Sequence, residues 1–280
     1  MQFVARTSSP PCLSARDLWF AYPESEPVLR GVSFTLDDSG FVALVGQNGS
    51  GKTTLVKHFN GLLRPMRGEV LLYGEDIRDR AVSQLACAVG YVFQNPDHQI
   101  FSATVREEIS FGLQQMALAP GEIAVRTDEA LAAFHLEPFA DEPPATLSFG
   151  LRRKVTVAAI FAMRPRVWIL DEPTTGLDRA AARALMERVL SLQREGATIL
   201  LITHDMRLVA EYAPRTAVMR GGEIIAADET RAVFAQPELL REAGLELPPI
   251  TELARRLSLP GTPLTVDEFT EIHRTRMNAD

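Results

Sequence analysis

The stretch GQNGSGKTT, residues 46–54, has the residue types and spacing of a phosphate-binding loop. Glycines let the backbone curl so that successive N–H groups point at phosphate oxygens, and the helix that begins next adds partial positive charge. Lys52 is spaced to reach β- and γ-phosphates, and the Thr53 hydroxyl to hold Mg²⁺. The residues predicted to bind the phosphates are Gly46, Gln47, Asn48, Gly49, Ser50, Gly51, Lys52, Thr53 and Thr54.

Two carboxylates end a buried apolar run far downstream of this loop. The run VWILDE, residues 167–172, places Asp171 to orient Mg²⁺ and Glu172 to polarise an attacking water. A base positioned in this way contributes roughly 10²–10⁴-fold in rate. An acidic pair after a strand is more often a plain turn, but the phosphate loop upstream favours catalysis here.

Two more polar side chains end apolar runs in the same manner. His204 ends TILLITH (198–204), and Gln94 ends VGYVFQ (89–94). The C-terminal ends of neighbouring parallel strands come together where ligands bind. We expect His204 to contact the γ-phosphate and Gln94 to contact the metal or the water. The predicted catalytic residues are therefore Lys52, Gln94, Glu172 and His204, and the predicted metal residues are Thr53, Gln94 and Asp171.

A parallel sheet is needed to bring these residues together, and the sequence predicts one. FVALVG (41–46) is a continuous apolar run, typical of a strand buried on both faces. Helices predicted at 51–63 and 179–193 alternate with such runs, as in βαβ units. An α/β fold follows. The other predicted strands are 13–20, 28–36, 69–74, 89–94, 167–170, 198–204 and two within 216–227.

The segment 95–165 differs in pattern from the rest of the chain. Strand signals vanish and helical periodicity takes over, most clearly at 122–136, which predicts a helical subdomain inserted into the core. From about residue 229 short helical patterns are broken by LPP and LPGTP, which predicts a C-terminal appendage. We expect one core domain at 12–228 and the appendage at 229–280.

Composition excludes several classes of protein. The net charge of −7 disfavours a sequence-neutral nucleic-acid binder. Cys12 and Cys87 are too few for a disulfide framework. The longest apolar stretches, such as 155–163, are far short of the roughly 20 residues that span a bilayer. Residues 1–12 carry no long apolar region, so we expect no signal peptide.

The order of motifs along residues 12–245 resembles the ATP-binding subunits of ABC transporters. The motifs are Tyr22, the 46–54 loop, Gln94, LSFG (147–150), LDEP (170–173), GLD (176–178) and His204. The resemblance implies a P-loop NTPase core with a mostly parallel sheet, an N-terminal antiparallel β part, an inserted helical subdomain and a small C-terminal helical appendage. ATP and Mg²⁺ are the implied cofactors.

The resemblance also assigns roles to single residues. Tyr22 would stack on adenine, and Asp178 would lie in the loop that faces a partner subunit. Such subunits form head-to-tail dimers, in which each ATP lies between one chain's phosphate loop and the other chain's signature sequence. Ser148 and Gly150 of this chain would therefore bind the partner's ATP.

Two segments, 91–113 and 238–257, narrow the resemblance to the energy-coupling-factor class, whose members import cobalt, nickel or vitamins. In that class Asp97 and Gln99 lie near the coupling helices of a transmembrane subunit, and the C-terminal extension contributes to dimer contacts. The implied partners are a second ABC ATPase subunit, a transmembrane coupling subunit and a substrate-binding membrane subunit, at the cytoplasmic face of the membrane. The solute, and whether the dimer is homo- or heterodimeric, stay open.

The signature segment, residues 147–151, departs from the family's Leu-Ser-Gly-Gly-Gln at Phe149 and Leu151. Ser148 can cap the helix and still offer a hydroxyl to phosphate, and Phe149 is harmless if it points away from the nucleotide. Leu151 lacks an amide, a loss of about 1 kcal/mol. A working clamp on the partner's ATP, a low-turnover partner in a heterodimer, a soluble non-transport ABC ATPase and a bare serine cap all remain as interpretations.

Overall fold

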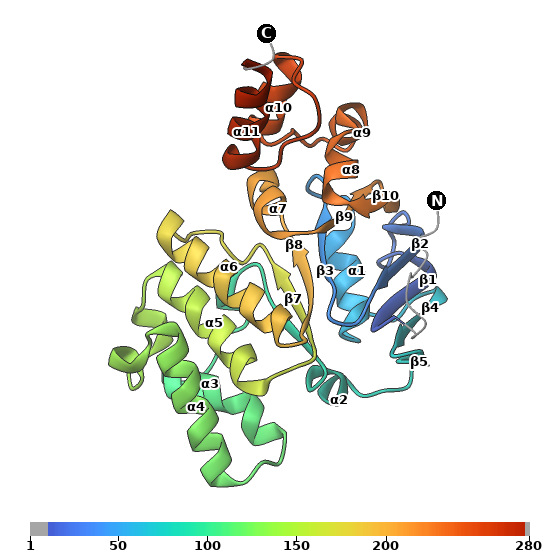
Figure 1. The fold of residues 1–280 in the computed structure, drawn as a ribbon. Coiled ribbons are helices and arrows are strands. Elements are labelled where there is room, and N and C mark those ends of the chain that lie inside the picture. Colours follow the sequence, from blue (N-terminus) through green and yellow to red (C-terminus); the bar gives the residue numbers. More distant parts are fainter. Residues whose placement is uncertain (1–10, 278–280) are drawn as a thin grey trace.

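A six-stranded sheet forms the centre of the computed structural model, which describes residues 11–277 (Figure 1). The expectation of no signal peptide falls almost entirely outside these residues. The strand order is β10-β9-β3-β8-β7-β6, with β10 antiparallel to β9 and all other neighbours parallel. The bounds are β3 Phe41–Val45, β6 Val89–Val92, β7 Val167–Asp171, β8 Thr198–Ile202, β9 Arg215–Arg220 and β10 Glu223–Glu229.

Both faces of β3 are buried, which explains its unbroken apolar sequence. Val42 and Leu44 face one core, shared with α1 (Lys52–Phe59) and the N-terminal sheet. Ala43 and Val45 face the other core, which the helices cover and which we call the main core. The helix predicted at 51–63 ends early, at Phe59, because the left-handed Gly61 (φ +74°) terminates it.

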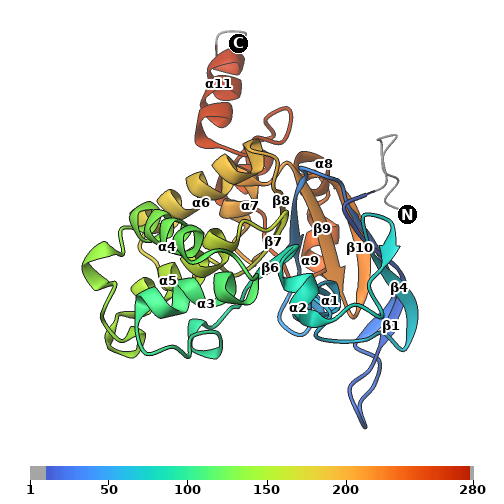
Figure 2. The same ribbon diagram turned by 90° about the horizontal axis from the view of Figure 1, so that it is seen from below.

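The predicted N-terminal antiparallel part is a four-stranded sheet of order β2-β1-β4-β5. Figure 2 shows it on one side of the molecule, with the helical group on the other. The strand predicted at 69–74 lies two residues earlier. The bounds are β1 Leu13–Phe20, β2 Leu29–Leu36, β4 Arg67–Leu72 and β5 Glu75–Asp76.

The inserted helical subdomain is confirmed between β6 and β7. Three helices pack on one another there, and the second is the helix predicted at 122–136. They are α3 Val105–Gln115, α4 Pro120–Phe134 and α5 Phe149–Met163. Two further helices belong to the core: α2 Val82–Ala86 and α6 Arg179–Arg194, the latter predicted at 179–193.

The C-terminal segment divides into two parts by its packing. Phe234 and Leu240, on the helices nearest the sheet, are buried in the main core. The last two helices project from the body (Figure 1), tied by an ion pair between Arg231 and Glu268. The bounds are α7 Met206–Tyr212, α8 Thr230–Phe234, α9 Pro237–Glu242, α10 Pro249–Arg256 and α11 Val266–Met277.

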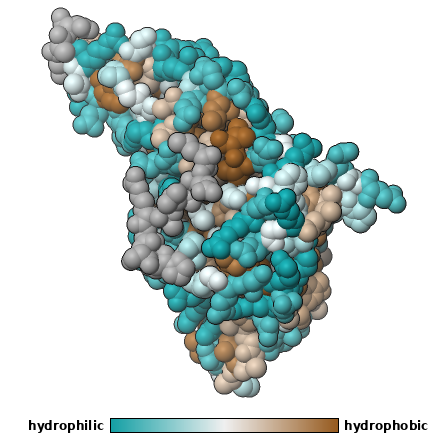
Figure 3. All heavy atoms as spheres, turned by 90° about the vertical axis from the view of Figure 1, so that its right-hand side faces the viewer, coloured by the Kyte–Doolittle hydropathy of each residue, from teal (hydrophilic) through white to brown (hydrophobic). Residues whose placement is uncertain are grey.

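The surface is largely hydrophilic on the side seen in Figure 3, with an apolar patch near the base of the appendage. Within residues 11–277, none of the helices combines the length and the apolar character that crossing a bilayer requires.

Candidate functional site

Four of the parallel strands, β3, β6, β7 and β8, are followed by predicted site residues at one edge of the sheet. The 46–54 loop leaves β3, Gln94 follows β6, and Asp171 and Glu172 end β7. A hollow of about 360 Å³ opens at this edge, and we call it the strand-end hollow. It is lined by Val28, Asn48, Gly49, Gly51, Lys52, Thr53, Thr54, Gln94, Asp171, Glu172 and Ile202.

Two glycines let the 46–54 loop fold tightly against β9. A Cβ on Gly46 (φ +154°) would lie 2.2 Å from the carbonyl oxygen of Met219. A Cβ on Gly51 (φ +105°) would lie 2.8 Å from the Met219 side chain. Because no side chain fits at either position, the loop's curl depends on glycine at both.

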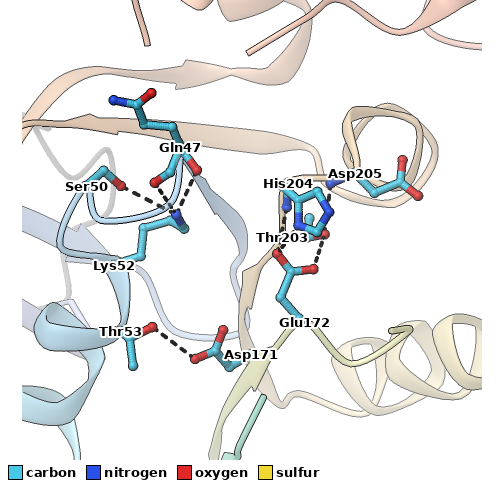
Figure 4. A network of polar contacts seen from close by, with 10 residues as sticks. Gln47, Ser50, Lys52, Thr53, Asp171, Glu172, Thr203, His204 and Asp205 are labelled. Carbon is cyan, nitrogen blue, oxygen red and sulfur yellow. Dashed lines mark hydrogen bonds and ion pairs between the residues drawn. The ribbon is translucent and has the colours of Figure 1, made fainter. Parts of the chain in front are cut away.

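Lys52 points back into its own loop, as Figure 4 shows. Its Nζ donates to the carbonyl oxygens of Gly46, at 2.7 Å, and Gln47, at 2.9 Å. Burial lowers the pKa of the Lys52 ammonium, and the nearby charges of Glu172 and Asp171 oppose that shift. Two backbone carbonyl oxygens of its own loop thus hold the Lys52 ammonium, and an anionic phosphate would compete with them for it.

Asp171 is buried beside the helix that follows the loop. Its Oδ2 accepts hydrogen bonds from the Tyr91 hydroxyl at 2.9 Å and the Thr53 hydroxyl at 3.4 Å. Burial raises the pKa of Asp171, while the bond from Tyr91 lowers it. Hydroxyl and carboxylate oxygens side by side, in a hollow also lined by Gln94, are the hard ligands that Mg²⁺ prefers. The residues present therefore fit this ion together with phosphate oxygens.

Glu172 is held by the end of the neighbouring strand, β8 (Figure 4). The Nδ1 atom of His204 lies 2.5 Å from Glu172 Oε1, which also accepts the His204 backbone N–H at 3.0 Å. Thr203 Oγ1 donates to Glu172 Oε2 at 3.1 Å. Glu172 has a φ of +48°, unusual for a side chain other than glycine and frequent at functional sites.

Tyr22 lies next to the helix that carries the phosphate loop. Its hydroxyl is 3.3 Å from Thr54 Oγ1, and its ring meets Phe20 edge-on with centroids 5.0 Å apart. Tyr22 as a whole stays partly exposed, at 38 %. An exposed aromatic face beside a phosphate loop is suited to stacking on a base.

The signature segment lies apart from these groups. Ser148 caps α5, its hydroxyl accepting the Leu151 N–H at 3.4 Å. Among the described residues, neither Ser148 nor Gly150 lines the strand-end hollow. Phe149 packs on Gly176, where an added Cβ would lie 2.4 Å from its ring. Leu151 packs against the main core.

Three residues of this region were missed by sequence reasoning. Tyr91 and Thr203 hold Asp171 and Glu172, and the buried Arg153 holds the backbone at Gln94. Thr203 directly precedes His204, and Tyr91 lies within a predicted strand, so the sequence indicated where both residues would lie. It did not indicate their partners, because Glu172 is 31 residues from Thr203 and Asp171 is 80 residues from Tyr91. Nothing in the sequence indicated that Arg153 would be buried, since a charged residue on a helix is usually exposed.

A parallel sheet with this loop, an acidic strand end and polar residues on two neighbouring strands defines a phosphate-loop nucleotide hydrolase. The ABC transporter family matches residues 29–175. The energy-coupling factor transporter ATP-binding protein EcfA of Methanocaldococcus jannaschii is 42 % identical over 248 residues, 88 % of this chain and 89 % of that protein. An ABC transporter ATP-binding protein of Caldanaerobacter subterraneus is 46 % identical over 92 % of this chain, which spans only 45 % of that relative.

Solved structures agree with these matches. CbiO1 of Clostridium perfringens, described as part of the ABC transporter complex cbiONQ, is 36 % identical with a TM-score of 0.74, covering 88 % of this chain and 99 % of that one. The ATP-binding cassette MJ0796, a dimer bound to ADP and Pi, is 26 % identical with a TM-score of 0.72, covering 78 % and 99 %. The chain belongs to the ABC transporter ATP-binding proteins, in their energy-coupling-factor class, and is an ATP-hydrolysing transport ATPase of that family.

Proposed function

We propose that this chain powers uptake of a metal ion or vitamin through separate membrane subunits, using the strand-end hollow as its ATP site. The observation that carries the proposal is the convergence of Lys52, Gln94, Asp171 and Glu172 on one hollow from the ends of three separate strands. Phosphoryl transfer to water needs mainly positioning and charge stabilisation, and these side chains supply both.

The chain's own residues divide the work. Backbone N–H groups of residues 46–54 bind the β- and γ-phosphates, and Lys52 exchanges its two carbonyl partners for phosphate oxygens. Tyr22 holds adenine by stacking. Thr53, Asp171 and Gln94 would hold Mg²⁺, which when bound offsets the charge of the phosphates. Glu172 orients the attacking water, and His204 contacts the γ-phosphate.

The second half of the site comes from another subunit. The exposed Ser148 and the adjoining Gly150 lie outside this chain's own hollow, so they are free to clamp a partner's ATP in a head-to-tail dimer. Asp178 caps α6 through its bond from the Ala181 N–H, and its loop faces the partner. A cassette of the same fold is dimeric with ADP and Pi bound, which supports this arrangement.

The transport role places the chain on the cytoplasmic face of the cell membrane, as a peripheral subunit. A transmembrane coupling subunit would meet it near Asp97 and Gln99, and a substrate-binding membrane subunit would select the solute. We place the ATPase domain at residues 12–228, and we assign residues 229–280 to an appendage that adds dimer contacts. The relatives that are energy-coupling factor ATPases and part of a cbiONQ complex support this role.

A low-turnover partner in a heterodimer is the second candidate. Leu151 stands where the family has an amide, and its partly buried side chain packs against the main core. The chain's own Lys52, Asp171, Glu172 and His204 are all in place. The missing amide at Leu151 would therefore slow hydrolysis of the partner's ATP and not of this chain's.

Co-expression with candidate membrane subunits of the energy-coupling-factor class tests the proposal. We expect the complex to co-purify, to contain a metal ion or vitamin, and to hydrolyse ATP. The variant Lys52→Ala should assemble equally well and lose ATP hydrolysis. An intact Lys52→Ala complex that still hydrolyses ATP would remove the strand-end hollow as the ATP site, and failure to bind any membrane subunit would remove the transport role.

A further inference from the structure

Arg153 lies on the second turn of α5 and is fully buried, with 0 % of its surface exposed. Its Nη1 donates to the carbonyl oxygen of Phe93 at 2.5 Å, and its Nη2 donates to the carbonyl oxygen of Gln94. These bonds join residues 59 and 60 positions apart in the sequence. Through Arg153, α5, the helix that begins at the signature segment, is therefore hydrogen-bonded directly to the turn that carries Gln94.

The surroundings of Arg153 are costly for a charged group. Burial lowers the pKa of its guanidinium, and the charges of Asp171 and Glu172 oppose that shift. Its Nε is buried without a hydrogen-bond partner. A well-packed apolar side chain often replaces even a buried ion pair with no loss of stability. Apolar packing alone could therefore hold α5 against the core, and the arginine adds the two bonds to the backbone at Phe93 and Gln94.

Phe149 extends the same connection toward the loop after Glu172. The Arg153 guanidinium lies 5.7 Å from the centre of the Phe149 ring, and that ring packs on Gly176. A Cβ on Gly150 would touch Leu177 of the same loop at 3.4 Å. The first turns of α5 thus contact both segments that leave β6 and β7, the strands that carry Gln94 and Glu172.

We propose that Arg153 is a positioning residue that passes displacement of the signature segment to Gln94 of the same chain. The inference rests on the proposed function, in which Ser148 meets the partner's ATP while Gln94 serves this chain's own ATP. Arg153 then links the two ATP sites of a dimer. A guanidinium suits this link because its planar fork binds two carbonyl oxygens in fixed geometry, which neither an ammonium nor a thioether can do.

The test compares three variants in the assembled ATPase. Arg153→Met keeps the length of the side chain and removes both donors, and Arg153→Lys restores the charge without the fork. Lys154→Met is the matched control, because it removes a positive charge from the neighbouring, partly exposed position of the same helix. Each protein is assayed for ATP hydrolysis, for binding of a fluorescent ATP analogue and for folding by circular dichroism.

We expect Arg153→Met to stay folded and to lower kcat by about tenfold or more, with KM for ATP and analogue binding unchanged, because small misplacements of a catalytic group cost about that much. The kcat of Arg153→Lys should lie between those of Arg153→Met and the wild type, and the kcat of Lys154→Met should match the wild type. A kcat for Arg153→Met equal to that of Lys154→Met would overturn the link, as would a loss of folding and nucleotide binding together in both Arg153 variants. Absence of hydrolysis in the wild type would overturn the proposed function, and this inference with it.

Discussion

The imidazole of His204 is hydrogen-bonded to the carboxylate of Glu172, with Nδ1 and Oε1 2.5 Å apart. Thr203 occupies the second carboxylate oxygen. The two groups proposed to act on the water and the γ-phosphate therefore hold each other. The His204 side chain is 68 % exposed, so it can swing toward a phosphate without disturbing the core.

The variant Glu172→Gln should bind ATP normally and hydrolyse it at least about a hundredfold more slowly, because a neutral amide is a poor base for the attacking water. Size-exclusion chromatography with ATP should then show a trapped closed dimer. The exposed Glu137→Gln should behave as wild type. Near-normal turnover in Glu172→Gln would remove Glu172 from the catalytic role.

The site's strand-end residues could be predicted from the sequence because each one follows a continuous apolar run. Parallel strands fix where such residues meet, so Gln94, Asp171 and Glu172 reach one hollow as the pattern implied. The ends of helices were harder to predict from the sequence, as the early end of α1 before Asn60-Gly61 shows. Arg153 could not be predicted, since its role depends on a packing of α5 against β6 that periodicity does not specify.

Asp171→Asn should stabilise the nucleotide-free protein at neutral pH. Burial raises the folded-state pKa of Asp171 above its unfolded value, so its contribution to stability is present below the unfolded pKa and is lost as pH rises through the folded pKa. Removing the charge should raise Tm by about 2–4 °C for each kcal/mol recovered. Thermal unfolding from about pH 4 upward measures this.

The exposed Asp79→Asn is the control for that series, since it removes one carboxylate from open solvent. Its Tm should follow the wild type at every pH. If Asp171→Asn also follows the wild type from acid to neutral pH, then the cost of burying the Asp171 charge is already offset by Tyr91 and Thr53.

Tyr22→Ala should raise KM for ATP by about tenfold and leave kcat nearly unchanged, since stacking on a base typically contributes about 1–3 kcal/mol. Tyr22→Phe removes only the hydroxyl that meets Thr54 Oγ1, and should retain most of the affinity. Titration with GTP adds a check, because stacking discriminates weakly between purines. An unchanged KM in Tyr22→Ala would place the adenine elsewhere.

Leu151→Gln restores the amide of the family's signature, and we expect a few-fold rise in ATPase activity. Because Leu151 packs against the main core, the same change should lower stability by about 1 kcal/mol. Leu151→Met keeps the volume without an amide and should alter neither property. ATPase assays and urea unfolding separate the two effects, and an unchanged rate in Leu151→Gln would mean that the departure is neutral.

Gly244 follows α9 and touches the phosphate loop from the C-terminal side. A Cβ on Gly244 (φ +68°) would lie 2.6 Å from Gln47 Oε1 and 3.3 Å from Gln47 Cβ. Gly244→Ala should therefore push on the phosphate loop and raise KM for ATP by about three- to tenfold, a shift of about 1 kcal/mol.

Gly261→Ala is the matched control for backbone strain. Gly261 has a similar φ of +79°, but its nearest neighbour would be Ile272 Cδ1 at 4.0 Å. Both variants carry the same left-handed penalty of about 1–2 kcal/mol, so a difference in KM between them reports the contact with Gln47 alone. Gln47→Ala in the Gly244→Ala background removes Oε1 and should return KM to that of Gln47→Ala. Equal KM values for the two glycine variants would show that the C-terminal segment does not position the phosphate loop.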